Sequence, residues 1–385
     1  MRFLYIRAKN SVDDLLLSLR AMGHEVQCLE GYSFDPEAVD EQALEALETM
    51  VETGYYDYLI SNLFFEEPSD ICERHGLPYI SWVYDSPLVT LFSESASNSV
   101  NRIFIFDRAL YNRVRERLKG RCFYLPLAAC MTRIAGLGIG PEHEKAFSCD
   151  ISFVGRLYEG GAYDRLIGSL PPEEGAILRS VLEEELCRWD RVRPWPRVRE
   201  SLVRILEEMG FYKKRAAHGM DEGEFLGTAM ISRKLAQMER ITVLNALAEA
   251  HPGVRLYNTG GSSHLQGVEI HPPVNYTTDM SRVFSLSRIN LNITLPSIET
   301  GLPQRVWDIM GSGGFLMTNR QEEAGEYFVP GEDMETFSSI GELLAKTDFY
   351  LRHEDLRLKI LLRGFEKVMK HHTFEHRIAS MLELA

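Results

Sequence analysis

The stretch that decides the fold is INLNITLPSIETGLPQRVWDIMGSGGFLMTN, residues 289–319. Its residues from Ile289 to Leu295 alternate apolar with polar side chains, and this period of two predicts a strand. Phe315–Met317 form a second apolar run. Between the runs, Gly301-Leu302-Pro303 opens a predicted helix, because proline suits a first helical turn. The connection is too long for a hairpin and fits a crossover between parallel strands.

Polar residues gather just after the first of these strands, where ligands bind in open parallel sheets. They are Glu299, Thr300, Gly301, Gln304 and Arg305, with Asp308 one turn further on. N–H groups at a helix start favour an anion such as phosphate. Gln304 and Asp308 are four residues apart on one helix face, so they can meet one ligand together. The alternative is an ion pair between Arg305 and Asp308.

The segment resembles the donor-binding segment of group 1 glycosyltransferases with the GT-B fold. The runs NLNIT and GLPQRVWDIMGSGGFLMTN resemble the CgeB-like branch, named after spore maturation proteins. In the superfamily, two acids lie eight positions apart; the second binds the ribose of the sugar nucleotide and the first contacts the donor sugar. Asp308 matches the second acid, and the first falls on Thr300, or on Glu299 with a gap. The resemblance therefore implies Glu299 as a catalytic-site residue and Thr300, Gly301, Leu302, Gln304, Arg305 and Asp308 as donor-binding residues.

A second motif follows a predicted strand at Asp150–Val154. Gly155-Arg156-Leu157 is similar to the Gly-Arg loop of this superfamily, whose arginine binds the donor diphosphate. The family's next lysine is replaced by Glu159-Gly160-Gly161, so we expect a second cation from Arg165, Lys234 or Arg305; the alternative is a donor that carries less charge. The alternative for Arg156 is a pair with an interdomain carboxylate. The loop with Asn275 and Tyr276 corresponds to the family's base-binding loop.

The N-terminal half contains six short apolar runs separated by helix-sized gaps, which predicts a doubly wound parallel sheet. The runs are Phe3–Ile6, Val26–Leu29, Tyr58–Phe64, Tyr79–Tyr84, Arg102–Phe106 and Cys122–Leu125. No GxGxxG motif follows the first run, so this half is not an ordinary dinucleotide site. Asp85 ends the fourth run and is the candidate acceptor-side residue or base; the alternative is an Asx turn before Pro87. Asn62 and Asp107 are weaker candidates.

The predicted fold class is α/β, of the GT-B type, with two Rossmann-like domains facing a cleft. We expect an acceptor-side domain at 1–135, a linker at 136–149 and a donor domain at 150–370. A helical insertion is expected at about 162–230, including helices at Leu178–Trp189 and Val198–Met209. The last segment, 371–385, is expected to form a helix that packs back on the N-terminal domain.

Composition and charge exclude several classes of function. A hydrophobic content of 45% and a charged content of 25% are ordinary for a globular protein. The net charge of −14 argues against a nucleic-acid partner. The chain has no apolar run long enough for a membrane span and no signal-peptide core at its start, so we expect a cytoplasmic protein. The six cysteines are scattered, which favours free thiols.

The resemblance implies transfer of a sugar from a nucleotide-sugar donor, with a UDP-sugar expected, to a protein or glycan acceptor. Retention of configuration and metal-independent catalysis are expected, with no cofactor besides the donor. His372 and His376 have zinc-like spacing, but a helix cap at Thr373 and the lack of a third ligand argue against a metal. The alternatives are a non-catalytic coat or scaffold protein with the same fold, and a sugar-nucleotide epimerase or phosphorylase. The oligomeric state is open.

Overall fold

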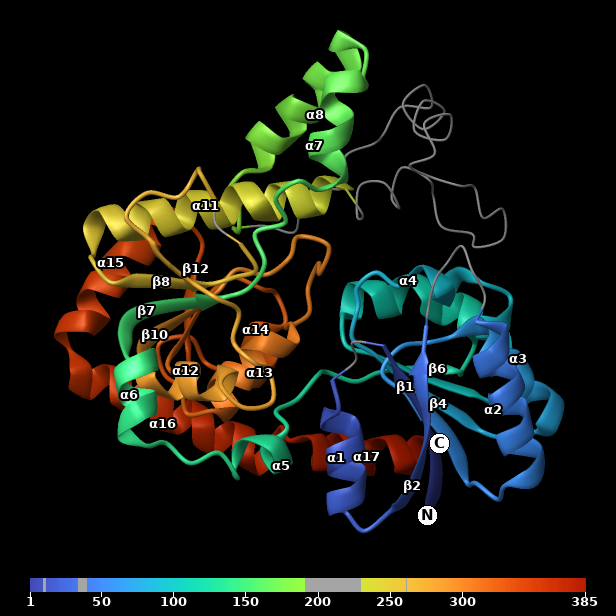
Figure 1. Ribbon diagram of the computed structural model, residues 1–385. Helices are drawn as coiled ribbons and strands as arrows, with labels where there is room; N and C mark the ends of the chain where they lie inside the picture. Colours follow the sequence, from blue (N-terminus) through green and yellow to red (C-terminus); the bar gives the residue numbers. More distant parts are fainter. Residues whose placement is uncertain (10–11, 34–39, 191–229, 261) are drawn as a thin grey trace. The chain divides into compact units, whose positions relative to one another are not determined.

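The computed structural model describes residues 1–9, 12–33, 40–190, 230–260 and 262–385 (Figure 1). The chain divides into two compact units. Among the described residues, unit 1 holds Met1–Gly136 and Lys370–Ala385, and unit 2 holds the residues between them. In the described residues, no helix is both long and apolar enough to cross a bilayer.

Unit 1 is built on a six-stranded sheet in the order β2-β1-β3-β4-β5-β6, with every neighbouring pair parallel. Its strands are β1 (Arg2–Ala8), β2 (Glu25–Tyr32), β3 (Tyr58–Ser61), β4 (Tyr79–Val83), β5 (Asn101–Ile105) and β6 (Cys122–Tyr124). All five residues of β4 are buried, as expected for a central parallel strand with both faces covered.

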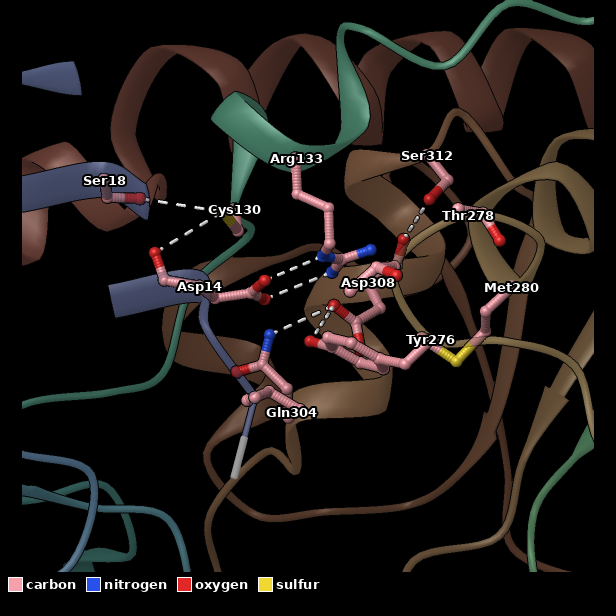
Figure 2. Close-up of polar contacts among 12 residues, drawn as sticks. Asp14, Ser18, Cys130, Arg133, Tyr276, Thr278, Met280, Gln304, Asp308 and Ser312 are labelled. Carbon is pink, nitrogen blue, oxygen red and sulfur yellow. Dashed lines mark hydrogen bonds and ion pairs between the residues drawn. The ribbon is translucent and has the colours of Figure 1, made fainter. Parts of the chain in front are cut away.

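Helices connect these strands and cover the sheet. They are α1 (Asp14–Ala21), α2 (Glu41–Thr53), α3 (Glu66–His75), α4 (Arg108–Leu118) and α5 (Met131–Ile134), with short 3-10 turns at Val89–Phe92 and Ser95–Ser97. Helix α1 packs with α5 and with α17 (Phe374–Leu384), and α2 packs with α3 (Figure 1). A buried ion pair from Arg133 Nε to Asp14 Oδ1, 2.8 Å long, joins α5 to α1 (Figure 2).

The final helix, α17, is part of unit 1 although it ends the chain. Arg377 donates hydrogen bonds to the carbonyls of Pro126 and Leu127, at 2.9 and 3.4 Å. The ring of Phe374 meets that of Trp82 edge-on, with centroids 5.0 Å apart. Unit 1 is therefore assembled from both ends of the chain.

Unit 2 contains a second six-stranded sheet, in the order β12-β11-β10-β7-β8-β9, again parallel throughout. Its strands are β7 (Cys149–Val154), β8 (Val254–Tyr257), β9 (Glu269–His271), β10 (Ser287–Asn292), β11 (Leu316–Asn319) and β12 (Glu335–Phe337). Two six-stranded parallel sheets with surrounding helices confirm the predicted α/β fold class.

The long helices α11 (Ser232–Ala250) and α15 (Ile340–Arg352) cover one face of this sheet, and α12 (Met280–Leu286) and α13 (Gln304–Gly311) cover the other (Figure 1). Unit 2 also contains α6 (Pro141–Phe147), α14 (Ala324–Tyr327) and α16 (Glu354–His371), besides the helices of the insertion described below. Helix α6 lies inside the segment at 136–149 that we expected to be a linker.

The stretch that opened the sequence analysis forms β10, α13 and β11. Strand β10 ends at Asn292, three residues earlier than expected, because side chains take over the backbone bonds there: Thr294 N donates to Asn319 Oδ1 at 2.7 Å. The asparagines of β10 are buried and hydrogen-bonded: Asn290 accepts from Ser152 Oγ at 2.8 Å, and Asn292 donates to Thr294 Oγ1 at 2.9 Å. The alternation of apolar and polar residues in β10 thus reflects a strand that is packed on both faces.

Two glycines after α13 have distinct roles. Gly313 adopts a φ of +69°, which favours glycine. A Cβ on Gly314 would lie 2.7 Å from the carbonyl oxygen of Phe284, so this position needs the close approach that only glycine allows. The Gly-rich turn therefore ends the helix and lets the chain enter β11 beside α12.

The described part of the predicted insertion is helical. It contains α7 (Ala162–Leu166), a 3-10 turn (Ile167–Ser169) and α8 (Pro172–Glu185), which starts six residues before the expected helix and ends four before its expected end. Apolar side chains of α7 and α8 form a small core with Met230, Ile231 and Leu235 at the start of α11. The expected helix at Val198–Met209 lies outside the described residues.

Candidate functional site

The candidate site lies along one edge of the unit 2 sheet. Strands β10, β7 and β8 are neighbours and run parallel, so the loops that follow them leave from the same edge. These loops carry most of the residues that the sequence singled out in the C-terminal half. This is the edge where open α/β sheets bind their ligands.

A cavity of about 500 Å³ opens beside the loops after β7 and β8. It lies within the size range of small-molecule sites. Four cationic residues line it, Arg156, Arg165, Arg233 and Lys234, with two acids, Glu159 and Asp164. Its other lining residues come from the loop after β7, from α7, from Met230 just before α11 and from the segment Asn258–Gly260. The excess of positive charge suits an anionic ligand.

Short polar contacts hold the lining of this cavity. Lys234 Nζ lies 2.5 Å from Asp164 Oδ1 and 3.0 Å from Gln237 Oε1. Arg165 donates to the carbonyl of Gly160 at 2.9 Å, and Gly160 N donates to Asp164 Oδ2 at 3.1 Å. The acid Asp164 thus anchors both a cation from α11 and the turn after β7.

The structure separates the three expected sources of a second cation. Arg165 and Lys234 line the same cavity as Arg156, whereas Arg305 does not line it. Its guanidinium instead contacts the sulfur of Met280 and lies 5.4 Å from the ring centre of Phe284. Arg305 therefore packs α13 against α12.

Asp308 forms a second polar group with two other predicted residues. Its Oδ1 accepts from Gln304 Nε2 at 3.1 Å and from the Tyr276 hydroxyl at 3.4 Å (Figure 2). The side chain of Asp308 is buried. The structure thus joins the start of α13 to the loop before α12, as a ligand bound by both would require.

The other predicted donor-site residues have mostly structural contacts. The oxygen of Asn275 accepts from Thr277 N at 2.8 Å in a turn of its own loop. Thr300 Oγ1 donates to Glu323 Oε1 at 2.6 Å in a buried bond. Gly301 and Leu302 are buried as well. For these two residues the backbone is the part that a ligand could meet.

Gly155 and Glu299 lie in the loops after β7 and β10. Gly155 N donates to the carbonyl of Tyr257 at 3.2 Å, and a Cβ at this position would come within 3.1 Å of the Phe153 ring. Glu299 lines a small cavity of about 30 Å³ together with Trp189 and Arg320. That volume has room for about one water molecule.

In unit 1, the predicted candidates follow β3, β4 and β5. Asp85 is exposed, directly after β4. Asp107 is fully buried: it caps α4 by accepting from Ala109 N at 3.2 Å, and it accepts from Ser86 Oγ at 2.5 Å. Asn62 Nδ2 donates to the carbonyl of Val12 at 3.0 Å. Asp107 and Asn62 therefore have structural partners, and the acceptor-side role of Asp85 stays a prediction.

The two histidines with zinc-like spacing have hydrogen-bond partners. His376 Nδ1 lies 2.8 Å from Thr373 Oγ1 in the capping box of α17, and His372 Nδ1 lies 2.9 Å from Arg377. Among the described residues, the one group with metal-ligand proximity is Glu48, Glu52 and His75. It is an acidic cluster at the surface of α2 and α3.

Part of the sequence and the fold of this chain are similar to those of known proteins. Residues 239–383, less than half of the chain, match the model of a family described as glycosyl transferase-like. Three solved structures cover all of this chain: a glycosyltransferase from Rickettsia africae (9% identity, TM-score 0.58, 97% of that chain), Anabaena Alr3699/HepE in complex with UDP (10%, 0.55, 100%) and sucrose-phosphate synthase from Thermosynechococcus elongatus (11%, 0.53, 98%). The fold is GT-B. No curated protein matches by sequence.

The predicted GT-B fold is confirmed by these structures, and residues 239–383, from within α11 to α17, match the glycosyl transferase-like family. The narrower CgeB-like branch stays a prediction. The matched residues include the Asp308 group, while Arg156 and Lys234 lie before them. The family match therefore does not cover these two cations, and only the geometry of the structure supports the cation-lined cavity as a binding site.

Sequence reasoning missed two cations of this region. Arg233 precedes Lys234 at the start of α11 and lines the cavity. Arg240 lies two turns further along the same helix, buried among Ala236, Val243 and Leu244. An arginine at helical spacing within an apolar stripe is the signal that could have identified it.

Proposed function

We propose that this GT-B chain transfers a sugar from a nucleotide-sugar donor to a protein or glycan acceptor. The observation that carries the proposal is the open cavity of about 500 Å³ with four cations at the ligand-binding edge of unit 2. A diphosphate is the part of such a donor that requires positive charge. A UDP-sugar is the proposed donor, supported by a structure of the same fold that contains UDP.

In the proposed donor site, Arg156 and Lys234 bind the diphosphate, with Arg233 beside them. Lys234 takes the place of the lysine that the Gly-Arg loop lacks. Asp308 accepts hydrogen bonds from the ribose hydroxyls, and Asn275–Tyr276 lie beside the base. The sugar lies near Glu299 and the backbone of Thr300–Leu302. The shared edge of β10, β7 and β8 supports this order.

The proposed chemistry breaks the bond between the anomeric carbon and the diphosphate oxygen, whose electron pair leaves with the phosphate. A hydroxyl or amide of the acceptor forms the new bond to that carbon and gives up its proton to the departing phosphate oxygen. Cations at the diphosphate stabilise the negative charge that develops there. We propose that the configuration is retained and that no metal takes part, with Asp85 on the acceptor side.

Two alternatives remain distinguishable. A scaffold protein that kept only the fold does not need an open cavity lined with cations, so the cavity favours a ligand-binding protein. A sugar-nucleotide epimerase would use the same donor site without an acceptor. Analysis of products with and without acceptor separates it from a transferase, because only the transferase releases free nucleoside diphosphate in step with acceptor modification.

Calorimetry with UDP-, GDP-, dTDP- and CMP-sugars tests the donor site. We expect binding of a UDP-sugar, and a loss of affinity of about ten-fold or more in Arg156→Ala and Asp308→Ala, because each removes a contact to a charged or hydroxyl-rich group. Arg352→Ala, which removes an exposed arginine of α15 outside the site, is the control. If no sugar nucleotide binds, or if both variants match the control, the proposed function is wrong.

A further inference from the structure

Arg240 of α11 connects two loops of the proposed donor site. Its NH1 donates to the carbonyl oxygen of Arg156 at 2.5 Å, and its NH2 donates to the carbonyl oxygen of Ile293 at 2.9 Å. Arg156 lies in the loop after β7, and Ile293 lies in the segment that leads from β10 to Glu299. One guanidinium therefore joins two segments that are far apart in the sequence.

The surroundings of Arg240 hold its guanidinium in place. The side chain is 7% exposed. Its guanidinium carbon lies 5.4 Å from the ring centre of Phe153 and 5.0 Å from that of Tyr158, close enough for cation–π contact. Tyr158 belongs to the same loop as Arg156 and has a φ of +62°, a backbone conformation that is uncommon for a tyrosine. The contact of Arg240 with the Tyr158 ring and its hydrogen bond to the Arg156 carbonyl thus both hold the loop after β7.

The bonds of Arg240 go to backbone carbonyls, so they set the course of the main chain and leave the Arg156 side chain available to the cavity. The same helix supplies Arg233 and Lys234 to that cavity, two turns earlier. The distance between the cations of α11 and the loop of Arg156 is therefore maintained by one rigid element. Burying the charge of Arg240 costs desolvation free energy, and its hydrogen bonds to the two carbonyls offset that cost.

We propose that Arg240 is a positioning residue for the donor: it holds the Arg156 loop and the segment after β10 at the spacing that a nucleoside diphosphate sugar requires. This inference rests on the proposed function for its ligand. A planar guanidinium can donate to two carbonyls at once, whereas a lysine ammonium is a single point charge on a flexible stem. Arginine is thus the residue that the position requires.

Arg357 of α16 provides a matched control. It is 4% exposed, and its NH1 donates to the carbonyl oxygen of Arg288 at 3.0 Å. Arg288 lies at the beginning of β10, whereas Ile293 follows the end of the same strand. Arg357 also pairs with Glu354 Oε1 of its own helix at 3.1 Å. Replacing either arginine removes a buried cation that donates to a backbone carbonyl of unit 2, but only Arg240 lies at the ligand-binding edge.

The experiment compares Arg240→Met, Arg240→Lys and Arg357→Met in the full chain by UDP calorimetry and by hydrogen exchange of backbone amides. We expect the Kd for UDP to rise about ten-fold in Arg240→Met and about three-fold in Arg240→Lys, and to change less than two-fold in Arg357→Met, since hydrogen bonds to charged groups are worth one to two decades. Exchange should increase in residues 155–161 and 293–301 together only when Arg240 is replaced.

Each outcome decides the matter. Unchanged exchange in those two segments would overturn the positioning role. Faster exchange in both segments with an unchanged Kd for UDP would show that Arg240 does not affect donor binding. If the unmodified chain does not bind UDP but Arg240→Met still loosens both segments, the donor assignment fails and the connection between the loops stands.

Discussion

Gly364 shows how closely α16 packs at the scale of one residue. A Cβ at this position would lie 2.2 Å from the carbonyl oxygen of Asp333 and 2.8 Å from the Met310 methyl group. We expect Gly364→Ala to lower the free energy of unfolding by about 1–3 kcal/mol, because overpacking outweighs the gain in helix propensity of about 1 kcal/mol. Urea denaturation measures it.

Gly341 of α15 is the control for that substitution, since a Cβ there would meet nothing within 4 Å. Gly341→Ala should stabilise the chain by up to about 1 kcal/mol. Equal effects of the two substitutions would contradict the packing described for α16.

The carboxylate of Asp333 should make stability depend on pH. Burial alone would raise its pKa, but hydrogen bonds from Lys367 Nζ at 2.8 Å and Val329 N at 2.9 Å hold its pKa below the usual value. A pKa lowered in the folded state stabilises above the unfolded value of about 3.9, and this stabilisation disappears as the pH falls through the folded pKa.

We therefore expect the free energy of unfolding to decrease from about pH 4 downward, and to decrease less steeply in Asp333→Asn. Urea denaturation at several pH values measures the slope. Asp355→Asn, at an exposed position of α16, should keep the slope of the unmodified chain. A slope that Asp333→Asn leaves unchanged would show that this carboxylate does not carry the effect.

Sequence reasoning succeeded at single residues where the spacing was local. Gln304 and Asp308 are four apart on one helix, and they do share a hydrogen bond. The sequence was less informative where the residues of the site come from distant segments. Lys234 was one of three candidate cations, and Arg233 and Arg240 were missed. Spacing carries no information about which loops of a sheet become neighbours after an insertion.

At the scale of elements, α11 carries the proposed anion site. Its first turn brings Arg233 and Lys234 to the cavity, and Lys234 is paired with Asp164. We expect Arg233→Met with Lys234→Met to raise the Kd for UDP about ten-fold or more, because the diphosphate loses two cations and meets an unpaired carboxylate. Calorimetry at increasing salt measures the loss.

Salt should weaken UDP binding less in that double variant than in the unmodified chain, because fewer charges remain to be screened. Lys359→Met, which removes an exposed lysine of α16, should leave both the Kd and its salt dependence unchanged. A salt dependence that is the same in all three proteins would place the anion elsewhere.

The elements themselves were largely predictable, because local periodicity and turn residues determine them. The six strands of unit 1 coincide with the apolar runs of the N-terminal half. The errors lie at strand ends: Ile293–Leu295 continue the alternation of β10, but the Ile293 carbonyl and the Thr294 N–H bond to side chains from elsewhere. A pattern of apolar residues cannot show where the ladder of backbone bonds stops.

At the scale of the whole molecule, every residue proposed to bind the donor lies in unit 2. We therefore expect UDP to slow hydrogen exchange in the loops after β7, β8 and β10 and at the start of α11, and to leave the strands of unit 1 unchanged, since bound ligand suppresses local opening. Exchange followed by mass spectrometry measures the protection. Protection confined to unit 1 would contradict the assignment.

The return of α17 to unit 1 has a consequence for biosynthesis. Arg377 and Phe374 contact segments near residues 126 and 82, so unit 1, whose sheet the ribosome makes first, includes a helix that is made after the whole sheet of unit 2. Nascent domains generally fold in the order of translation. In this chain the sheet of unit 2 can form before α17 has been made, whereas unit 1 can complete its packing around Trp82 only after residues 374–384 have left the ribosome.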